Sequence, residues 1–184
     1  MILLVGRSGA GKDTIKKELI RLGCGSVVTY TTRPARDKEI NGVSYHFISE
    51  EEFLNKKNEG FFVETTSYHV ATGETWYYGT SKEDLNGDKV LIVNPYGLKS
   101  IKMMCSSDII SFLIDVDNKT LMKRLDKRGD NPEEVTRRMA ADENDFADIY
   151  KYIDHIIKNN GTFSAGAVAD EIAAIYKKER GGFA

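Results

Sequence analysis

Short, uniformly apolar runs alternate along much of the chain with longer stretches whose apolar residues recur at helical spacing. The apolar runs predict strands buried on both faces of a sheet, and they cover residues 2–5, 27–29, 90–93, 109–114 and 153–157. The amphipathic stretches predict helices over residues 13–22, 96–104, 118–127 and 164–178. Such alternation is typical of βαβ units. We therefore expect an α/β fold with three layers, in which helices cover both faces of a parallel sheet.

The pattern changes between residues 33 and 80, where polar and aromatic residues replace the buried runs. The elements predicted there are a half-exposed strand through Val43, Tyr45 and Phe47, a helix over residues 51–59 capped by Ser49, and strands over residues 61–66 and 75–78. This part predicts a small mixed α+β lobe inserted into the parent sheet.

The chain of 184 residues is long enough for one domain with a full core. We expect a single domain over residues 1–184, with its core at 1–32, 81–125 and 139–184, the inserted lobe at 33–80 and a lid at 126–138. The net charge of −2 gives no electrostatic reason to expect nucleic acid or an anionic membrane as a partner.

Features of a secreted or membrane protein are missing from the sequence. No apolar run approaches the roughly 20 residues that cross a bilayer, and the initial strand leaves no room for a signal peptide. Cys24 and Cys105 are far apart and lack the spacing of metal ligands, so we expect buried, reduced thiols. These features predict a soluble cytoplasmic protein, and we expect a monomer or a weak homodimer.

The first candidate for chemistry is the glycine-rich stretch GRSGAGK at residues 6–12. Strand, glycine loop, lysine and helix follow one another as in a phosphate-binding loop (P-loop). Glycines let backbone N–H groups converge on phosphate oxygens, and the helix dipole adds positive potential. Lys12 would reach the terminal phosphates. The alternative, an ordinary glycine turn, does not account for the lysine at this spacing.

The residue after the lysine departs from the usual phosphate-loop pattern. A Ser or Thr that ligates magnesium is expected there, whereas this chain has Asp13, followed by Thr14. A carboxylate oxygen is also a suitable ligand for Mg²⁺, directly or through water. The residues expected at the donor phosphates are Gly6, Arg7, Ser8, Gly9, Ala10, Gly11, Lys12, Asp13 and Thr14.

A second phosphate site is predicted by the run TTRPAR and the aromatic residue that follows it. Arg33 and Arg36 are three residues apart, and Tyr45 comes shortly after them. Guanidinium groups and a phenol hydroxyl suit a phosphate dianion. The alternative is a solvated basic turn. A phosphoryl-transfer enzyme needs an acceptor site besides the donor site, which favours the phosphate interpretation.

Arginines also gather in the second half of the chain. They are Arg124, Arg128, Arg137 and Arg138, and the segment 129–132 (GDNP) between them predicts a mobile loop. Arginines beside such a loop can neutralise the charge that develops on a transferring phosphoryl group. In the alternative interpretation they form helix-surface ion pairs with Asp126, Glu133, Glu134 and Asp142.

Taken together and in this order, the motifs resemble those of the guanylate kinase family over essentially the whole chain. The matching segments are GRSGAGK, TTRPAR with Glu39, Gly42, Tyr45 and Phe47, then FVE at Glu64, YYGT at 77–80, KRLDKRG and Arg138. The resemblance implies an enzyme that transfers the γ-phosphoryl group of ATP to GMP or dGMP with Mg²⁺.

The resemblance also implies roles for individual residues. Arg33, Arg36, Tyr45 and Tyr78 would hold the GMP phosphate, and Glu64, Thr29 and Thr80 would read its base. Lys12, Arg128 and Arg138 would be catalytic, and Asn159, or the adjacent Asn160, would lie near the ATP base. Glu64 suits guanine on chemical grounds, because one carboxylate can accept both the ring N–H and the exocyclic amine. A surface glutamate is the alternative.

One strand end departs from the family. Acidic residues are usual where this chain has Ile92 and Asn94. Asn94 could still bind a base or a water, and we include it among the expected GMP-binding residues. We hypothesise that Asp13 supplies the charge missing from this strand end.

Two other functions remain open at this point. A ribose 1,5-bisphosphate phosphokinase would fit Asp13 and Asn94, but a sugar phosphate has no guanine edge for Glu64 to read. A non-catalytic guanylate-kinase-like binding module is the other, although such modules usually lose the phosphate loop and the lid.

Overall fold

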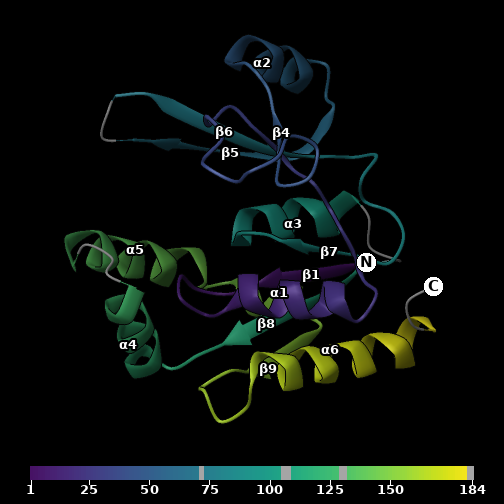
Figure 1. The fold of residues 1–184 in the computed structure, drawn as a ribbon, viewed down its shortest axis with the longest axis vertical. Coiled ribbons are helices and arrows are strands. Elements are labelled where there is room, and N and C mark those ends of the chain that lie inside the picture. The colour runs from purple at the N-terminus through teal and green to yellow at the C-terminus, as the bar shows by residue number, and fades with distance from the viewer. Residues whose placement is uncertain (71–72, 105–108, 129–131, 182–184) are drawn as a thin grey trace. The chain divides into compact units, whose positions relative to one another are not determined.

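The computed structural model describes residues 1–70, 73–104, 109–128 and 132–181 (Figure 1). Within these ranges it describes the backbone but not the side chains of Arg128, Pro132, Glu133, Glu134, Arg137, Arg138, Ala141 and Glu143. The chain folds into two compact units, one of Met1–Ser26 with Gly87–Ala184 and one of Val27–Asn86.

The first unit is built on a parallel sheet of five strands in the order β2-β7-β1-β8-β9. The strands are β1 (Ile2–Val5), β2 (Gly25–Ser26), β7 (Lys89–Ile92), β8 (Ile110–Asp115) and β9 (His155–Lys158). The helices are α1 (Lys12–Arg21), α3 (Pro95–Met104), α4 (Asn118–Arg128), α5 (Pro132–Asp145), the 3-10 helix η1 (Ile149–Tyr152) and α6 (Ala165–Arg180). The predicted parallel α/β architecture is confirmed.

Strand β1 lies at the centre of this sheet, and its four residues are fully buried. Because side chains alternate along a strand, Ile2 and Leu4 point to one face and Leu3 and Val5 to the other. Ile2 and Leu4 belong to the core that α1 and α6 cover, and these two helices pack against each other (Figure 1). On the other face, α3 contacts β1 and η1. An uninterrupted apolar run is the consequence of burial on both faces.

A polar network around Asp154 and the buried Ser111 connects the start of β9 to β8. The carboxylate of Asp154 accepts hydrogen bonds from the backbone N–H and the hydroxyl of Ser111, both at 2.7 Å, and from the Lys102 ammonium. Ser111 is fully buried, so its polar groups need these partners. The network sets the register at which β9 delivers Asn159 to the end of the sheet.

The second unit has a four-stranded mixed sheet in the order β4-β3-β6-β5, with one helix. Its elements are β3 (Tyr30–Thr31), β4 (His46–Phe47), α2 (Glu50–Asn58), β5 (Phe62–His69) and β6 (Thr75–Ser81). Strands β3 and β4 are parallel, and the other neighbours are antiparallel. Ser49 caps α2 by accepting the Glu52 N–H, as its sequence predicts. The expected mixed α+β lobe is therefore present.

The two faces of the β5–β6 hairpin differ. In the observed register Glu64 lies opposite Thr80, Thr66 opposite Tyr78 and Tyr68 opposite Trp76, so these six residues share one face. Towards the other face, a Cβ on Gly79 would lie 2.8 Å from the Phe62 ring, which stacks on Phe53 of α2. Helix α2 thus covers one face and leaves the Glu64 face for other contacts.

Two strand predictions are wrong. Residues 27–29 lie outside any strand, between β2 and β3, although Val27 is buried; the apolar run there reflects burial alone. The half-exposed strand through Val43 shrinks to β4, because Val43 and Ser44 donate backbone hydrogen bonds to the Ile40 carbonyl and form a turn.

Cys24 is a buried free thiol, as predicted, and burial raises its pKa to about 12. Cys105 lies outside the described residues. Within the described ranges, no helix is long and apolar enough to cross a membrane.

Candidate functional site

The glycine-rich loop connects β1 to α1 in the first unit, as its sequence predicts. Gly9 and Gly11 have φ values of +81° and +91°, which side-chain-bearing residues rarely adopt. The Ala10 N–H donates to the Arg7 carbonyl at 3.1 Å, and α1 begins directly after Gly11. The first N–H groups of α1 therefore follow at once on those of the loop, which is the arrangement that binds phosphate.

Glycine is also required here because the loop packs closely on its surroundings. A Cβ on Gly6 would lie 2.8 Å from the Ile114 carbonyl oxygen, and one on Gly11 would lie 2.9 Å from Asn159 Nδ2. One on Gly9 would lie 3.2 Å from the Leu125 side chain. The loop is thus held between the end of β8, helix α4 and the residue after β9.

Lys12 turns back over the loop. Its ammonium donates to the carbonyls of Gly6 at 2.6 Å and Arg7 at 3.0 Å. This contact holds the positive charge at the mouth of the loop, where terminal phosphates would bind.

Asn159 and Arg124 brace the loop from outside. Asn159 is buried and donates from Nδ2 to the Ala10 carbonyl at 2.9 Å. Arg124, on α4, donates to the Asn159 carbonyl at 2.8 Å, and its other Nη lies 3.4 Å from the Gly9 and Ala10 carbonyls. Asn160, the alternative to Asn159, instead accepts the Asp117 N–H. The sequence had left Arg124 between a lid role and a surface ion pair, and nothing in its helical spacing reveals a partner 115 residues away.

A carboxylate also contacts the loop. Asp142 of α5 accepts the Ser8 N–H at 3.1 Å. Burial raises the pKa of Asp142, while the Ser8 hydrogen bond and the charges of Lys12 and Arg7 oppose that rise. The sequence had suggested Asp142 only as a partner in surface ion pairs.

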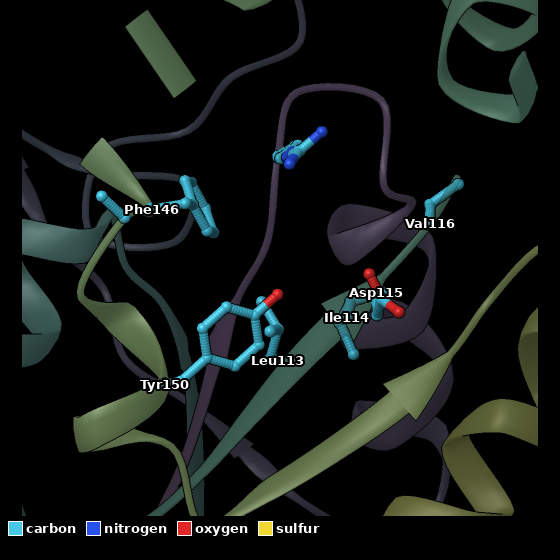
Figure 2. A pocket seen from close by; sticks show the side chains of 8 residues that line it. Leu113, Ile114, Asp115, Val116, Phe146 and Tyr150 are labelled. Carbon is cyan, nitrogen blue, oxygen red and sulfur yellow. The ribbon is translucent and has the colours of Figure 1, made fainter. Parts of the chain in front are cut away.

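A cavity of about 220 Å³ borders the loop on the side of Arg7. Its lining consists of Arg7, Leu113, Ile114, Asp115, Val116, Phe146, Ala147 and Tyr150. Figure 2 shows the Tyr150 ring on one side of it and Asp115 and Val116, at the end of β8, on the other. Arg7 itself donates to Asn118 Oδ1 at 2.7 Å, which ties the loop to the start of α4.

Asp13, the residue expected to hold magnesium, lies in the first turn of α1 and is followed by Thr14. Asp13 and Thr14 are both exposed. Among the described residues, no three His, Cys, Asp or Glu side chains come together to form a metal cage. Mg²⁺ commonly takes one or two carboxylates and completes its shell with phosphate and water. An exposed Asp13 beside a phosphate loop fits that mode of binding.

The predicted acceptor residues Arg33, Tyr45 and Tyr78 meet in the second unit. Arg33 is 4% exposed and its guanidinium lies 5.4 Å from the centre of the Tyr45 ring, and the hydrogen bond to Glu39, with Tyr78 nearby, raises its pKa. The Tyr45 and Tyr78 rings are 6.2 Å apart. Glu39 accepts from Arg33 Nη2 at 2.8 Å and from the Arg36 backbone N–H at 2.7 Å. Arg36 itself is exposed. A phosphate would therefore meet a guanidinium already oriented by Glu39 and two aromatic rings.

The predicted base-reading residues Glu64 and Thr80 also meet. The Thr80 hydroxyl donates to Glu64 Oε1 at 2.6 Å across the hairpin. Burial raises the pKa of Glu64, and the Thr80 hydrogen bond opposes this. Thr29 precedes Tyr30, which pairs with Gly79, the neighbour of Thr80. The Thr80 hydrogen bond uses Oε1 of Glu64, so Oε2 can accept a hydrogen bond from a ligand.

Three further predicted site residues belong to the first unit. Asn94 belongs to the first unit, where its Oδ1 accepts the Gly97 N–H at 2.7 Å and caps α3. Arg128 lies at the end of α4 and Arg138 within α5, and their side chains lie outside the described residues.

Adding one methyl group to the loop should abolish its function. Gly11→Ala combines a φ of +91° with a Cβ only 2.9 Å from Asn159 Nδ2, so the Asn159 brace must move. We expect binding of a nucleoside triphosphate, measured by calorimetry, to fall at least about 100-fold. Gly23→Ala is the matched control, because Gly23 also has a positive φ (+101°) but nothing lies within 4 Å of its added Cβ. Equal losses in both variants would contradict this assignment.

Comparisons with known proteins agree with this geometry. The family model described as guanylate kinase matches residues 1–170. A guanylate kinase of Paraburkholderia xenovorans is 34% identical over 77% of this chain and 64% of that protein. One of Clostridium tetani is 34% identical over 95% of this chain and 82% of that protein. The crystal structure of guanylate kinase from Anaplasma phagocytophilum has the same fold, with a TM-score of 0.73 at 23% identity over 98% of this chain and 85% of that one. The chain belongs to the guanylate kinase family.

Proposed function

We propose that this protein transfers the γ-phosphoryl group of ATP to GMP or dGMP, giving ADP and GDP or dGDP. The observation that carries the proposal is the placement of Glu64, Thr80 and Tyr78 on one face of the β5–β6 hairpin. Glu64, a carboxylate that can accept guanine donors, thus lies on β5 opposite Thr80 of β6, and Tyr78, which neighbours Arg33, lies two residues from Thr80 along β6. This spacing suits a purine base joined to a phosphate.

On the acceptor side, Glu64 reads the guanine edge. The free carboxylate oxygen and the oxygen shared with Thr80 can together accept the ring N–H and the exocyclic amine. Adenine presents an acceptor at the equivalent ring nitrogen and would leave the buried carboxylate unpaired, which disfavours it. Arg33, Arg36, Tyr45 and Tyr78 hold the acceptor phosphate, and Thr29 and Asn94 complete the proposed set.

On the donor side, the loop binds the ATP phosphates through its N–H groups and Lys12. Transfer needs no covalent intermediate, so positioning and charge neutralisation supply the rate. Lys12, Arg128 and Arg138 are the proposed neutralising cations, with residues 126–138 as a lid and 33–80 as the GMP lobe. Asn159 lies near the ATP base and also holds the loop through the Ala10 carbonyl. Asp13 would hold Mg²⁺, which when bound would neutralise negative charge on the donor phosphates.

The two alternatives are not favoured. The relatives reported above, from Paraburkholderia xenovorans and Clostridium tetani, are named guanylate kinases. The loop, its lysine and its bracing contacts are intact, whereas a pure binding module would not need them. We also propose that the protein acts in the cytoplasm, which agrees with the free thiol of Cys24. We propose further that it is a monomer or a weak homodimer.

A panel of acceptors tests the function directly. With ATP and Mg²⁺, we expect ADP release with GMP and dGMP and none above background with AMP, UMP or ribose 1,5-bisphosphate. Turnover with the sugar bisphosphate alone would overturn the proposal. Binding of GMP without turnover on any acceptor would indicate a binding module instead.

Replacing the base-reading carboxylate should damage GMP use selectively. Glu64→Gln places an amide donor where guanine also donates, so kcat/KM for GMP should fall about 10- to 100-fold while KM for ATP stays unchanged. Trp76, the single tryptophan, shares the hairpin face with Glu64 and reports GMP binding by fluorescence. Glu51→Gln, an exposed change on α2, is the control; a GMP loss equal to that of Glu64→Gln would refute the assignment.

The same carboxylate predicts a pH dependence. Because the pKa of Glu64 is raised, it becomes protonated at a higher pH than an ordinary glutamate, and GMP affinity should decline at that higher pH on acidification.

Removing the loop carboxylate should separate metal use from acceptor binding. In Asp13→Ala we expect the Mg²⁺ concentration for half-maximal activity to rise roughly 10-fold, because a hard oxygen ligand is lost. GMP affinity, followed by Trp76 fluorescence, should not change. Asp170→Ala on α6, another exposed aspartate, controls for net charge. Equal losses of metal dependence and GMP affinity would count against a metal role for Asp13.

A further inference from the structure

Asp142 is the acidic side chain that touches the phosphate loop in this structure. It lies on α5, is partly buried, and accepts the Ser8 N–H at 3.1 Å through Oδ2. Among the side chains that the structure describes, its charged neighbours include Lys12 and Arg7 of the loop, which attract it, and Asp145 on its own helix, which repels it. A carboxylate is therefore seated on a loop whose N–H groups are arranged for anions.

The Ser8 contact differs from the other contacts that hold the loop. Asn159, Arg124 and Lys12 all donate to loop carbonyls, and none of them competes with a phosphate for a donor. Asp142 instead accepts from a loop N–H, which is the kind of group that a phosphate oxygen uses. It also brings a negative charge to a place where a triphosphate must come.

We infer that Asp142 sets the affinity of the loop for the phosphoryl donor: its carboxylate accepts a hydrogen bond from an N–H of the anion-binding loop, and the donor triphosphate must displace it. The inference rests on the proposed function in one respect, which is that ATP is the phosphoryl donor. The interaction with Asp142 keeps the loop in order without a ligand, and its charge lowers the affinity for the ligand.

The charge and the hydrogen bond of Asp142 can be separated by substitution. Asp142→Asn has nearly the same size and keeps an acceptor oxygen for the Ser8 N–H, but it carries no charge. Asp142→Ala removes both. If Asp142 only braces the loop, Asn should restore wild-type binding and Ala should weaken it. If its charge competes with the donor, Asn should bind the donor more tightly than the wild type does.

The experiment is calorimetric titration of ATP and of adenosine into the wild type, Asp142→Asn, Asp142→Ala and Asp145→Asn, with no acceptor present. Asp145 is the matched control, because it is an exposed aspartate on the same helix. We expect Asp142→Asn to bind ATP roughly 3- to 10-fold more tightly and Asp145→Asn to change by less than about 2-fold, since removing a nearby like charge is worth on the order of 1 kcal/mol. Adenosine, which lacks phosphates, should show no gain in either variant.

Two results would overturn the inference. One is ATP binding by Asp142→Asn that equals or falls below that of the wild type, and the other is an equal gain for adenosine. A far-UV circular dichroism spectrum equal to that of the wild type shows that each variant is folded. Because no acceptor is phosphorylated in these titrations, their outcome is independent of the acceptor panel that tests the proposed reaction.

Discussion

The close approach of the loop backbone to its surroundings is the constraint on which the rest of the first unit depends. Gly6, Gly9 and Gly11 have no room for a Cβ against Ile114, Leu125 and Asn159, which come from three different parts of the chain. Each of these parts must therefore lie close against the loop backbone. The parallel sheet achieves this, because β1, β8 and β9 are adjacent and end at one edge. Central burial of β1 and the Asp154–Ser111 network are the means by which the sheet holds that edge.

A second theme is that groups predicted to bind phosphate already have partners within the chain. Arg33 bonds to Glu39, the Lys12 ammonium bonds to two loop carbonyls, and the Ser8 N–H bonds to Asp142. Such partners satisfy polar groups that would otherwise be buried or misdirected, and they orient them before a ligand arrives. Their effect on affinity depends on charge. A neutral carbonyl orients a cation without repelling a phosphate. A carboxylate orients its partner as well, but it also repels the phosphate.

The sequence predicts regular and local features well and long-range contacts poorly. The strand at residues 2–5, the loop at 6–12 and the Ser49 cap follow from periodicity and short motifs, and the structure confirms them. The family resemblance assigned Glu64 and Thr80 to one base-reading site, and the hydrogen bond between them depends on the hairpin register. The contacts of Arg124 and Asp142 with the loop span more than 100 residues of sequence, and helical spacing carries no information about them. The strand predicted at 27–29 was wrong because burial was taken for strand periodicity.

The placement of carboxylates around the donor loop follows from what the chain lacks elsewhere. At the end of β7, where the family usually has acidic residues, Asn94 is used as the cap of α3, and its amide oxygen is committed to the Gly97 N–H. A charged residue could also accept that N–H, so capping alone does not explain the neutral side chain. Two other carboxylates lie at the loop instead: Asp13 begins α1, and Asp142 reaches it from α5. Asp13 is exposed and free to approach a metal with the donor, while Asp142 is bonded to the loop before the donor arrives. The two carboxylates therefore differ in their proposed effect on the donor. Asp13 is placed to bind a metal together with the phosphates, whereas Asp142 must be displaced from the loop by them.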